Sequence, residues 1–439
     1  MKLLPYLSSK IDLLRPRYIY ELSLVLFLCS LSTLSQQSNT AYQKRVLEQA
    51  ELETLFSYYA QDGSNAAVTG GEGTEELTDA TSTIVLRMPL NEDDILTLDA
   101  GISAYTSASS SNVDPFDSRS AGNAFQASSG ASRRDVLAYF NPAYVHSSKD
   151  RNKIWSANAY VSNEYDYFSF GFGGEYTYLF NEKNTEFSFN GQVYLDKWNP
   201  QYPVELRPGY SNGIIGYDPM FNAFQNNYRN SYSLGLGFSQ IVSSKLQLRL
   251  GTEIIYQDGL LSTPFQRVYF ADRADFFQEE FQLADNVEQL PNSRIKIPVS
   301  ARLNYYWNDY VVLRSFYRFY YDDWGIRSNT FQLEAPVKLG EQFTLYPNYR
   351  YYQQSAADYF YAKDVALSTY QYYTSDYDLS TYTAHQYGFG VQYKDIFTKS
   401  RFLLFGLKAL NLRLAYYQRS NGLNATIVTL GASFVVDSN

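Results

Sequence analysis

The chain has 439 residues, a formal net charge of −9 and many aromatic residues, with 43 tyrosines and 29 phenylalanines. The acidity argues against a nucleic-acid partner, because phosphate binding needs a concentrated basic face. The slightly negative mean hydropathy excludes a bundle of membrane helices, which needs several runs of about 20 apolar residues. A β-barrel stays compatible with it, because every second residue of a barrel strand faces a polar lumen.

The N-terminus has the features of an export signal. A basic segment at 2–17 precedes the apolar run 22–34, which is too short to span a bilayer, and small residues close it. The pattern predicts a cleaved signal peptide over 1–35 and a short periplasmic segment over 36–50, with an uncleaved signal anchor as the alternative.

From about residue 80 onward, alternating segments are separated by turns and loops, and 294–307 is the clearest of them. Its apolar positions are Ile295, Ile297, Val299, Ala301, Leu303, Tyr305 and Trp307. Its other face carries Arg294, Lys296, Ser300, Arg302, Asn304 and Tyr306. Only a period of two separates these sets, so the segment is predicted to be a β-strand whose apolar face ends in aromatic residues.

Soluble β-sandwiches also alternate and are the alternative fold. The segments here run for about 10 to 14 residues, which is longer than the ~5–6 of soluble strands and closer to a tilted membrane strand. Their polar faces carry Arg, Glu, Asn and Gln, and their apolar faces end in Tyr, Phe and Trp. Both features favour a transmembrane β-barrel over 51–437, in contact with outer-membrane lipid.

The connections alternate between short turns and long loops, the latter at about 108–134, 198–228, 260–293 and 356–382. Bacterial barrels place short turns and both termini in the periplasm, which requires an even strand number. From Thr81 onward there are about fifteen strands, and the segment 51–61, although it could pass for an amphipathic helix, supplies one more. The prediction is an all-β, antiparallel, up-and-down barrel of about sixteen strands with periplasmic termini and long extracellular loops, wide enough for an aqueous channel.

The polar faces place more basic than acidic side chains in the predicted lumen. The inward basic residues are Arg249, Lys296, Arg302, Arg314, Arg318, Arg350 and Arg413, and the inward acids are Glu175, Glu186, Glu253 and Glu334. Arg302, Arg314 and Arg318 lie on one hairpin, where like charges repel unless Glu334, an inserted acidic loop or a bound anion pairs with them. Two interpretations stay open: an Arg–Glu network that braces the wall, and a lumen selective for anionic solutes.

The long loops have distinct compositions. The loop 260–293 is aromatic and acidic, and is expected either to fold into the lumen against the arginines or to project outward as a partner-binding cap. The tyrosine-rich loop 360–382 fits surface recognition, and the Ser/Ala/Asn/Asp-rich stretch 107–132 fits disorder. Only about 15 residues separate the signal from the first strand, which argues against a plug domain in front of the barrel.

No pattern indicates a metal or cofactor site. The only cysteine, Cys29, lies in the signal segment, and the two histidines, His146 and His385, are far apart in the sequence. The chain is therefore expected to bind no metal and no cofactor.

A group of residues is predicted at the outer rim. Asp322 and Asp323 follow a strand and precede Trp324. An acidic pair in this position is more typical of a solvated or Ca²⁺-contacting loop than of a catalytic dyad. Together with Asp378 and His385 it defines a rim hydrolase as the enzymatic alternative.

Several stretches are similar to one uncharacterised bacterial family. They are 50–59 (AELETLFSYY), 70–86 (GGEGTEELTDATSTIVL), 260–265 (LLSTPF) followed by 267–270 (RVYF), and 320–326 (YYDDWGI). On these motifs the chain resembles, from about residue 40 to 437, the family called "domain of unknown function 3570". The resemblance implies an outer-membrane barrel and a setting beside thioredoxin-like proteins, small lipoproteins and flavin-attaching enzymes of the envelope. It implies no activity and no catalytic residues.

These observations predict an outer-membrane protein that is not an enzyme. The favoured function is a pore for small solutes, anionic ones in particular. The first alternative is a non-conducting barrel that anchors or houses an envelope lipoprotein or redox partner, and the rim hydrolase is the second.

Overall fold

The computed structural model describes residues 45–106, 134–207, 215–278 and 281–436. The predicted signal peptide and the stretch 107–132 lie outside the described residues, so both stay predictions. No helix within the described ranges is long and apolar enough to cross a membrane.

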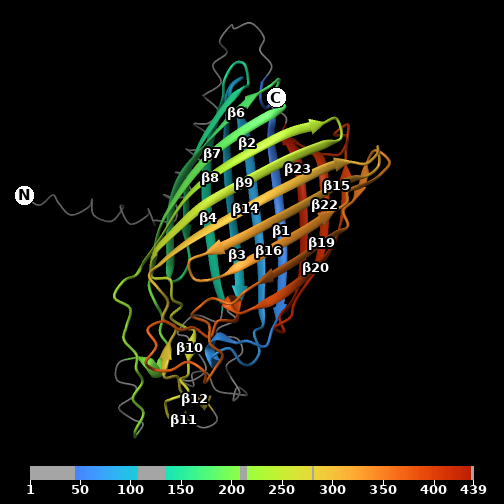
Figure 1. The fold of residues 1–439 in the computed structure, drawn as a ribbon. Coiled ribbons are helices and arrows are strands. Elements are labelled where there is room, and N and C mark those ends of the chain that lie inside the picture. The colour runs from blue at the N-terminus through green and yellow to red at the C-terminus, as the bar shows by residue number, and fades with distance from the viewer. Residues whose placement is uncertain (1–44, 107–133, 208–214, 279–280, 437–439) are drawn as a thin grey trace, which may run out of the picture.

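The strands form one closed antiparallel barrel (Figure 1). Neighbours along the chain pair with one another, and β1 (Ala50–Asp62) pairs with β23 (Asn424–Val436) to close the wall. Of the 19 strands described in this sheet, β17, β18 and β21 are short pieces beside turns, which leaves a wall of 16 strands. The predicted fold class and strand number are confirmed.

The elements follow one another with little besides strand. Between β1 and β23 the wall strands are β2 (Leu77–Pro89), β3 (Asp94–Thr106), β4 (Arg134–Ser147), β5 (Lys153–Asn163), β6 (Tyr167–Phe180), β7 (Thr185–Trp198), β8 (Tyr228–Ser243), β9 (Leu246–Gly259), β14 (Ser293–Tyr306), β15 (Val312–Asp322), β16 (Arg327–Glu334), β19 (Asn348–Gln354), β20 (Tyr382–Lys394) and β22 (Phe405–Arg419). The short pieces beside turns are β17 (Val337–Leu339), β18 (Phe343–Leu345) and β21 (Arg401–Phe402). The loops hold β10 (Arg267–Val268), β11 (Phe277–Gln278), β12 (Phe281–Gln282), β13 (Asn286–Val287) and the 3-10 turns η1 (Ala67–Thr69), η2 (Val204–Leu206) and η4 (Tyr377–Leu379).

The segment near Glu51 is a strand, as strand parity requires, and not an amphipathic helix. Its register places Leu52 opposite Leu86 on β2 and opposite Phe434 on β23. A helix would satisfy its own backbone groups, whereas here these groups join the two ends of the sheet. The barrel therefore has no free edge between β1 and β23.

The outer face of the wall is apolar and exposed. On the neighbouring strands β8, β9 and β14, Leu234 is 59 %, Ile254 56 % and Val299 47 % exposed. A continuous apolar surface of this kind is unusual in water, and lipid tails are the surroundings that suit it. Trp307, at the turn end of β14, is 60 % exposed and fits the interfacial belt of such a barrel.

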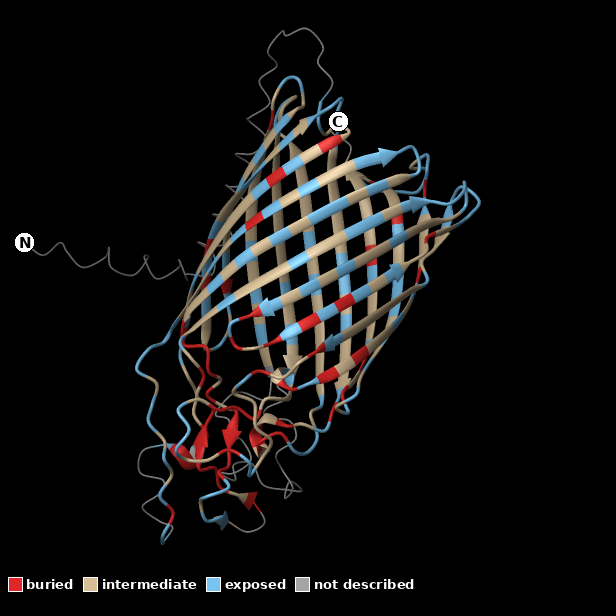
Figure 2. Cartoon of the chain, in the orientation of Figure 1, coloured by how far each residue is buried: buried red, intermediate tan, exposed pale blue. Residues whose placement is uncertain are grey.

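Four loops pack together into a cap at one end of the barrel, defined as the described residues of 63–76, 199–227, 260–292 and 355–381. Figure 2 shows buried residues gathering there, beyond the strand ends. The buried apolar residues of the cap are Ala66, Val68, Leu206, Tyr217, Leu260, Leu261, Val268, Tyr269, Phe270, Phe281, Leu283, Ala284, Val287, Leu290, Ala357, Ala366 and Tyr373. The sequence left two placements open for the loop 260–292, inside the lumen or projecting outward. In the structure it projects outward, beyond the strand ends (Figure 1). The tyrosine-rich loop 360–382 contributes to the core of the cap, because its Tyr373 side chain is buried there.

A buried ion pair links the cap loops. The side chains of Arg267 on β10 and Glu205 in η2 are completely buried, and Arg267 Nη2 donates to Glu205 Oε2 over 3.0 Å. Arg267 Nη1 also donates to the carbonyl oxygen of Val68 over 3.0 Å. One guanidinium thus holds three loops that are far apart in the sequence. Removal of either charge would leave the other buried without its partner.

Replacement of Arg267 by alanine is expected to open the cap and leave the wall intact. The buried Glu205 carboxylate would lose its partner, at a cost of about 3–5 kcal/mol to the cap. Hydrogen–deuterium exchange in detergent micelles should become faster over 260–292 and stay unchanged in the wall strands. The control is Arg207→Ala, which removes an exposed arginine whose Nε donates to the Tyr202 carbonyl. Equal protection of the cap in R267A and wild type would contradict this role.

Candidate functional site

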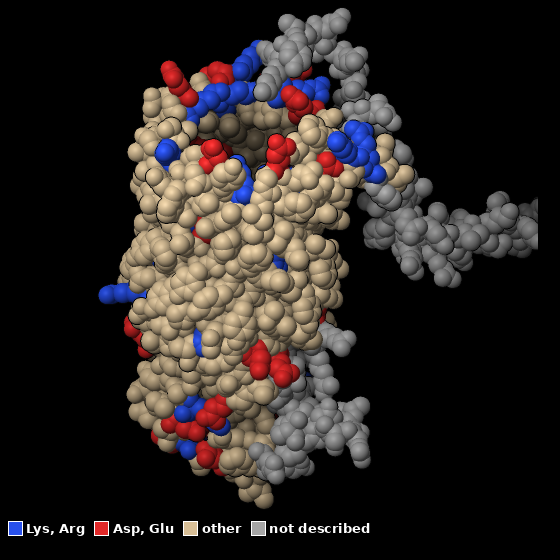
Figure 3. All heavy atoms as spheres, turned by 90° about the vertical axis from the view of Figure 1, so that its right-hand side faces the viewer, with Lys and Arg blue, Asp and Glu red and all other residues tan. Residues whose placement is uncertain are grey.

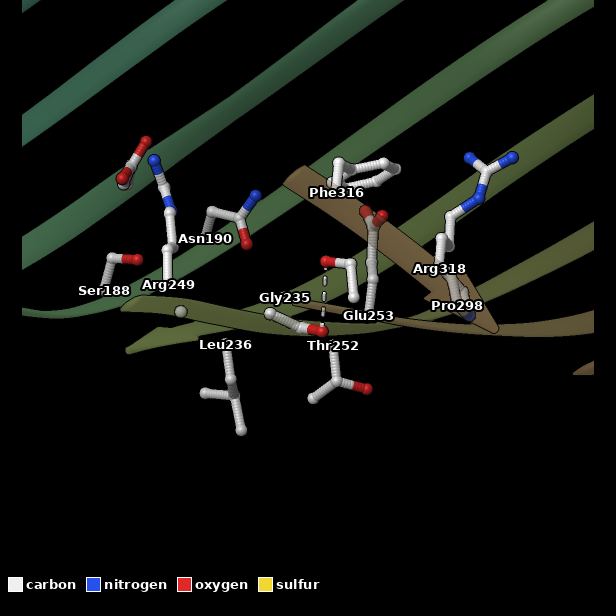
Figure 4. A pocket seen from close by; sticks show the side chains of 14 residues that line it. Ser188, Asn190, Gly235, Leu236, Arg249, Thr252, Glu253, Pro298, Phe316 and Arg318 are labelled. Atoms are coloured by element: carbon white, nitrogen blue, oxygen red, sulfur yellow. Dashed lines mark hydrogen bonds between the residues drawn. The ribbon is translucent and has the colours of Figure 1, made fainter. Parts of the chain in front are cut away.

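The candidate site is the lumen, and the strand register decides which side chains line it. Residues directly opposite on neighbouring strands share a face of the sheet. Arg249 on β9 lies opposite Arg302 on β14, and Arg302 lies opposite Phe316 on β15, so all three share one face. In Figure 4, Arg249 and Arg318 point to the same side of the wall, and Leu236 points to the opposite, lipid side.

Glu334 on β16 binds two of the predicted lumen arginines. Its Oε1 accepts a hydrogen bond from Arg314 Nη1 on the adjacent β15, and its Oε2 accepts one from Arg413 Nη1 on β22, each over 3.0 Å. Because β19 and β20 separate β16 from β22, Arg413 reaches along the wall, and its guanidinium lies 4.8 Å from the centre of the Tyr346 ring. This group is a network that braces non-adjacent strands.

Other lumen arginines have no carboxylate partner. Within the described residues, no carboxylate oxygen lies within 4.0 Å of Arg249, Arg302, Arg318 or Arg350. The buried Nε atoms of Arg318 and Arg350 have no hydrogen-bond partner in the described part of the chain. Arg302 lies over the Phe316 ring, 5.5 Å from its centre. Of Arg302, Arg314 and Arg318, the lumen arginines predicted on the β14–β15 hairpin, only Arg314 is therefore paired with an acid.

The arc of wall from β1 to β7 carries carboxylates that the sequence-based face assignment left out. The register puts Glu51, Glu53, Asp79, Asp99 and Asp196 on the lumen face. Three are held by donors from other strands. Arg87 Nη1 on the adjacent β2 lies 2.7 Å from Glu53, and the Tyr139 hydroxyl on β4 lies 3.0 Å from Asp99. Lys408 Nζ on β22 reaches past β23 to lie 2.6 Å from Glu51. The alternation in 51–61 could have revealed the first two, since Leu52 and Thr54 face outward. The lumen thus has an acidic arc facing a basic one.

The two ends of the lumen differ. Figure 3 shows a hollow mouth at the end away from the cap, ringed by basic and acidic side chains. A cavity of about 410 Å³ at this end is lined by residues that include Glu51, Glu53, Lys394 and Lys408. This end carries the short turns and both chain ends of the barrel, which are periplasmic in barrels of this type.

The predicted rim residues have structural contacts. Asp322 is completely buried, and its Oδ1 accepts hydrogen bonds from the backbone amides of Trp324 and Ile326 over 3.1 and 2.9 Å. Its Oδ2 accepts from Arg294 Nε over 3.0 Å. Asp323 Oδ1 accepts from a β14 amide over 2.9 Å, and Trp324 is 3 % exposed. These contacts fix the β15–β16 turn and leave the Asp322 carboxylate inaccessible to a substrate.

The residues of the hydrolase alternative do not meet. His385 lies opposite Tyr351 on the lipid-facing side of β20, whereas Asp322 is on the lumen side. Asp378 forms an ion pair with Arg419. Within the described residues, no group of three or more His, Cys, Asp or Glu side chains could hold a metal ion. Asp322, Asp378 and His385 are therefore not brought together into one site.

Several cap carboxyls are shielded from water. Burial raises the pKa of Glu75 to about 7 and the pKa of Asp285 to about 6. Burial also raises the pKa of Glu288, and burial together with the negative charge of Asp378 raises the pKa of Asp376. Each of these groups keeps its proton to higher pH in the folded cap than in an opened loop.

The fold and the lumen define the class of protein. A closed barrel with an apolar, lipid-facing outer surface and a polar, charged interior is a transmembrane β-barrel of the outer-membrane type. A family model described as "Protein of unknown function (DUF3570)" matches residues 25–433, and the chain belongs to this family. No curated protein matches the chain.

Three solved structures illustrate the similarity in architecture. A bacterial polysaccharide outer membrane secretin matches with a TM-score of 0.45 and 10 % identity, over 89 % of this chain and 99 % of that one. A BenF-like porin from Pseudomonas fluorescens Pf-5 matches with a TM-score of 0.40 and 9 % identity, over 89 % and 100 %. Pseudomonas aeruginosa OccK1 matches with a TM-score of 0.37 and 9 % identity, over 88 % and 97 %.

Replacement of Asp322 by alanine is expected to destabilise the outer rim. It leaves the Arg294 guanidinium and two backbone amides without their acceptor, at about 1–3 kcal/mol for each buried group. The midpoint of thermal unfolding, read by heat-modified gel migration, should fall clearly. Asp323→Ala is the matched control, because it removes an acceptor of one amide. Equal midpoints for the two variants would contradict the difference in role, and turnover of a lipid or peptide substrate by the wild type would contradict the purely structural assignment.

The cap is expected to loosen as the pH rises. A carboxyl with a raised pKa binds its proton more tightly in the folded cap, so it stabilises the cap fully below about pH 4 and loses that contribution as the pH rises to about 7. Exchange over 260–292, corrected for intrinsic rates, should therefore be faster at pH 8 than at pH 5. Glu75→Gln with Asp376→Asn should reduce this difference. Greater protection at pH 8 would show that the sign is wrong.

Proposed function

We propose that this barrel is an outer-membrane pore whose basic arc conducts small anionic solutes. The observation that carries the proposal is the pair Arg249 and Arg302. These residues are directly opposite on neighbouring strands, face the lumen, and have no carboxylate within 4.0 Å in the described structure. Two positive side chains that start from directly opposite positions repel each other, and a passing anion relieves that repulsion.

Two further arginines extend the basic arc. Arg318 and Arg350 have no carboxylate within 4.0 Å in the described structure, so their positive charges are not neutralised by the wall. Rings of arginine in a pore favour anions, because the wall lowers the energy of a negative charge along the path. The network around Glu334 serves the other predicted purpose and braces the wall, so the two interpretations apply to different arginines.

The cap controls the outer end in this proposal. Its core is packed, and its loops are tied to the barrel by Arg419 with Asp378 and by Asn65 with the Asn421 carbonyl, 2.8 Å apart. Conduction therefore depends on how far the cap opens. We further propose that the chain is exported by the predicted signal over 1–35 and folds with both termini in the periplasm.

A second candidate function rests on the difference between the two ends. The extracellular end is covered by a cap with its own core, and the periplasmic end has a hollow, charged mouth. Both features suit a non-conducting barrel that holds a periplasmic lipoprotein or redox partner. The charged ring of the mouth would recognise that partner. This candidate predicts an absence of ion conduction, both with the cap intact and with it removed.

Planar-bilayer recording tests the pore. In a salt gradient the reversal potential of the wild type is expected to shift toward anions, and Arg302→Glu with Arg318→Glu should shift it back toward cations. Charge reversal at Lys149, which lies in an exposed turn outside the lumen, is the matched control and should change nothing. If the lumen substitutions leave the reversal potential unchanged, the proposed arginine-lined conduction path is contradicted.

Deletion of residues 262–292 tests the cap. Its removal takes away Arg267 and much of the cap core, so single-channel conductance is expected to rise or to appear. Heat-modified gel migration checks that the wall still folds. No conductance in either protein would exclude the pore and favour the second candidate.

A further inference from the structure

One cavity in the lumen wall is lined by charged groups of both signs. It has a volume of about 380 Å³ and is named here the mixed-charge pocket. It is lined by Glu175, Ser188, Asn190, Gly235, Leu236, Gly237, Arg249, Gly251, Thr252, Glu253, Pro298, Ser300, Phe316 and Arg318. Figure 4 shows Ser188, Asn190, Arg249, Glu253 and Arg318 projecting to the lumen side of the strands.

Glycines on β8 make room for the pocket. A Cβ at Gly235 would lie 2.0 Å from Asn190 Oδ1, and one at Gly237 would lie 2.3 Å from Ser188 Oγ. The Asn190 and Ser188 side chains therefore lie flat over the β8 backbone. The charged side chains of β9 and β15 therefore border a hollow with a polar floor.

The charged groups of the pocket do not neutralise one another. No ion pair within 4.0 Å joins Arg249 or Arg318 to Glu175 or Glu253 in the described residues. Glu175 Oε1 accepts a hydrogen bond from the Thr177 hydroxyl over 3.2 Å. Arg318 Nε is buried and has no hydrogen-bond partner within the described chain. In the view of Figure 4, the Glu253 carboxylate lies between the two guanidinium groups. Separated charges of both signs are left for a solute.

We infer that the mixed-charge pocket binds solutes that carry both an ammonium and a carboxylate group, such as amino acids and short peptides. The inference rests on the proposed pore and adds dipolar solutes to the anionic ones proposed for its basic arc. Arg249 and Arg318 bind the carboxylate, and Glu175 and Glu253 bind the ammonium group. A simple anion is attracted by the guanidinium groups but repelled by the two carboxylates. A simple cation is attracted by the carboxylates but repelled by the guanidinium groups. Only a dipolar solute satisfies both sets.

The test measures binding to the full-length protein in detergent micelles, which needs no conduction because the periplasmic mouth is hollow. The three probes are glycylglycine, N-acetylglycine and glycinamide, which carry both charges, the carboxylate alone and the ammonium alone. In titration calorimetry, the Kd of glycylglycine is expected to be at least tenfold lower than the Kd of N-acetylglycine and that of glycinamide. Glu175→Gln with Glu253→Gln should remove that preference. Glu186→Gln, a change at a lumen acid of β7 outside the pocket, should preserve it.

The outcomes separate this inference from the pore itself. Equal affinity for the three probes, or a preference that survives E175Q with E253Q, overturns the inference. An anion-shifted reversal potential together with equal affinities leaves the pore standing and removes only the dipolar site. A clear preference for glycylglycine in a protein that does not conduct removes the pore and keeps the site.

Discussion

The constraint on which the structure depends is that no backbone group may stay unpaired inside a bilayer. Lipid offers no hydrogen bonds, so each N–H and C=O of the wall must be bonded to a neighbouring strand. The pairing of β1 with β23 meets this condition for the strands that would otherwise be edges. It also explains why the segment at Glu51, which could have formed a helix, is a strand. Closure also creates a lumen that is separated from lipid, and polar side chains can line it.

Closure also separates two kinds of chemistry along each strand. Alternate side chains must meet lipid on one side and water on the other, which accounts for the exposed Leu234 and Ile254 and for the lumen arginines. Charge is then distributed unevenly around the lumen, with most acids on β1 to β7 and arginines that have no acidic partner on β9, β14, β15 and β19. Glu253 on β9 and Glu334 on β16 are acids within the basic arc. Glu334 joins two arginines into a brace, and its neighbours stay unpaired. A polar wall with both features can carry selectivity without losing stability.

The cap is stabilised in the same way as a small soluble domain. It buries apolar side chains and a complete ion pair, Arg267 with Glu205, in loops that join separate strands. Its carboxyls with raised pKa values make it less stable as the pH rises. The wall is held by long, continuous backbone pairing, whereas the cap has only short pairings such as β10 with β13 and is held largely by side-chain packing. The cap is therefore the part of the molecule in which a change of conformation costs least.

The sequence by itself determined most of the wall strands, their approximate number and the faces of the side chains in the clearest segments, because alternation with a period of two is a local property. It also indicated Glu334 as a partner for the hairpin arginines. Only the tertiary structure decided that Glu334 binds Arg413 from β22 together with Arg314, that His385 and Asp322 lie on opposite faces, and that Arg267 finds Glu205. These pairings join residues on strands or loops far apart in the chain. They depend on the curvature of the closed wall and on how four loops pack at its end, and no local pattern encodes either.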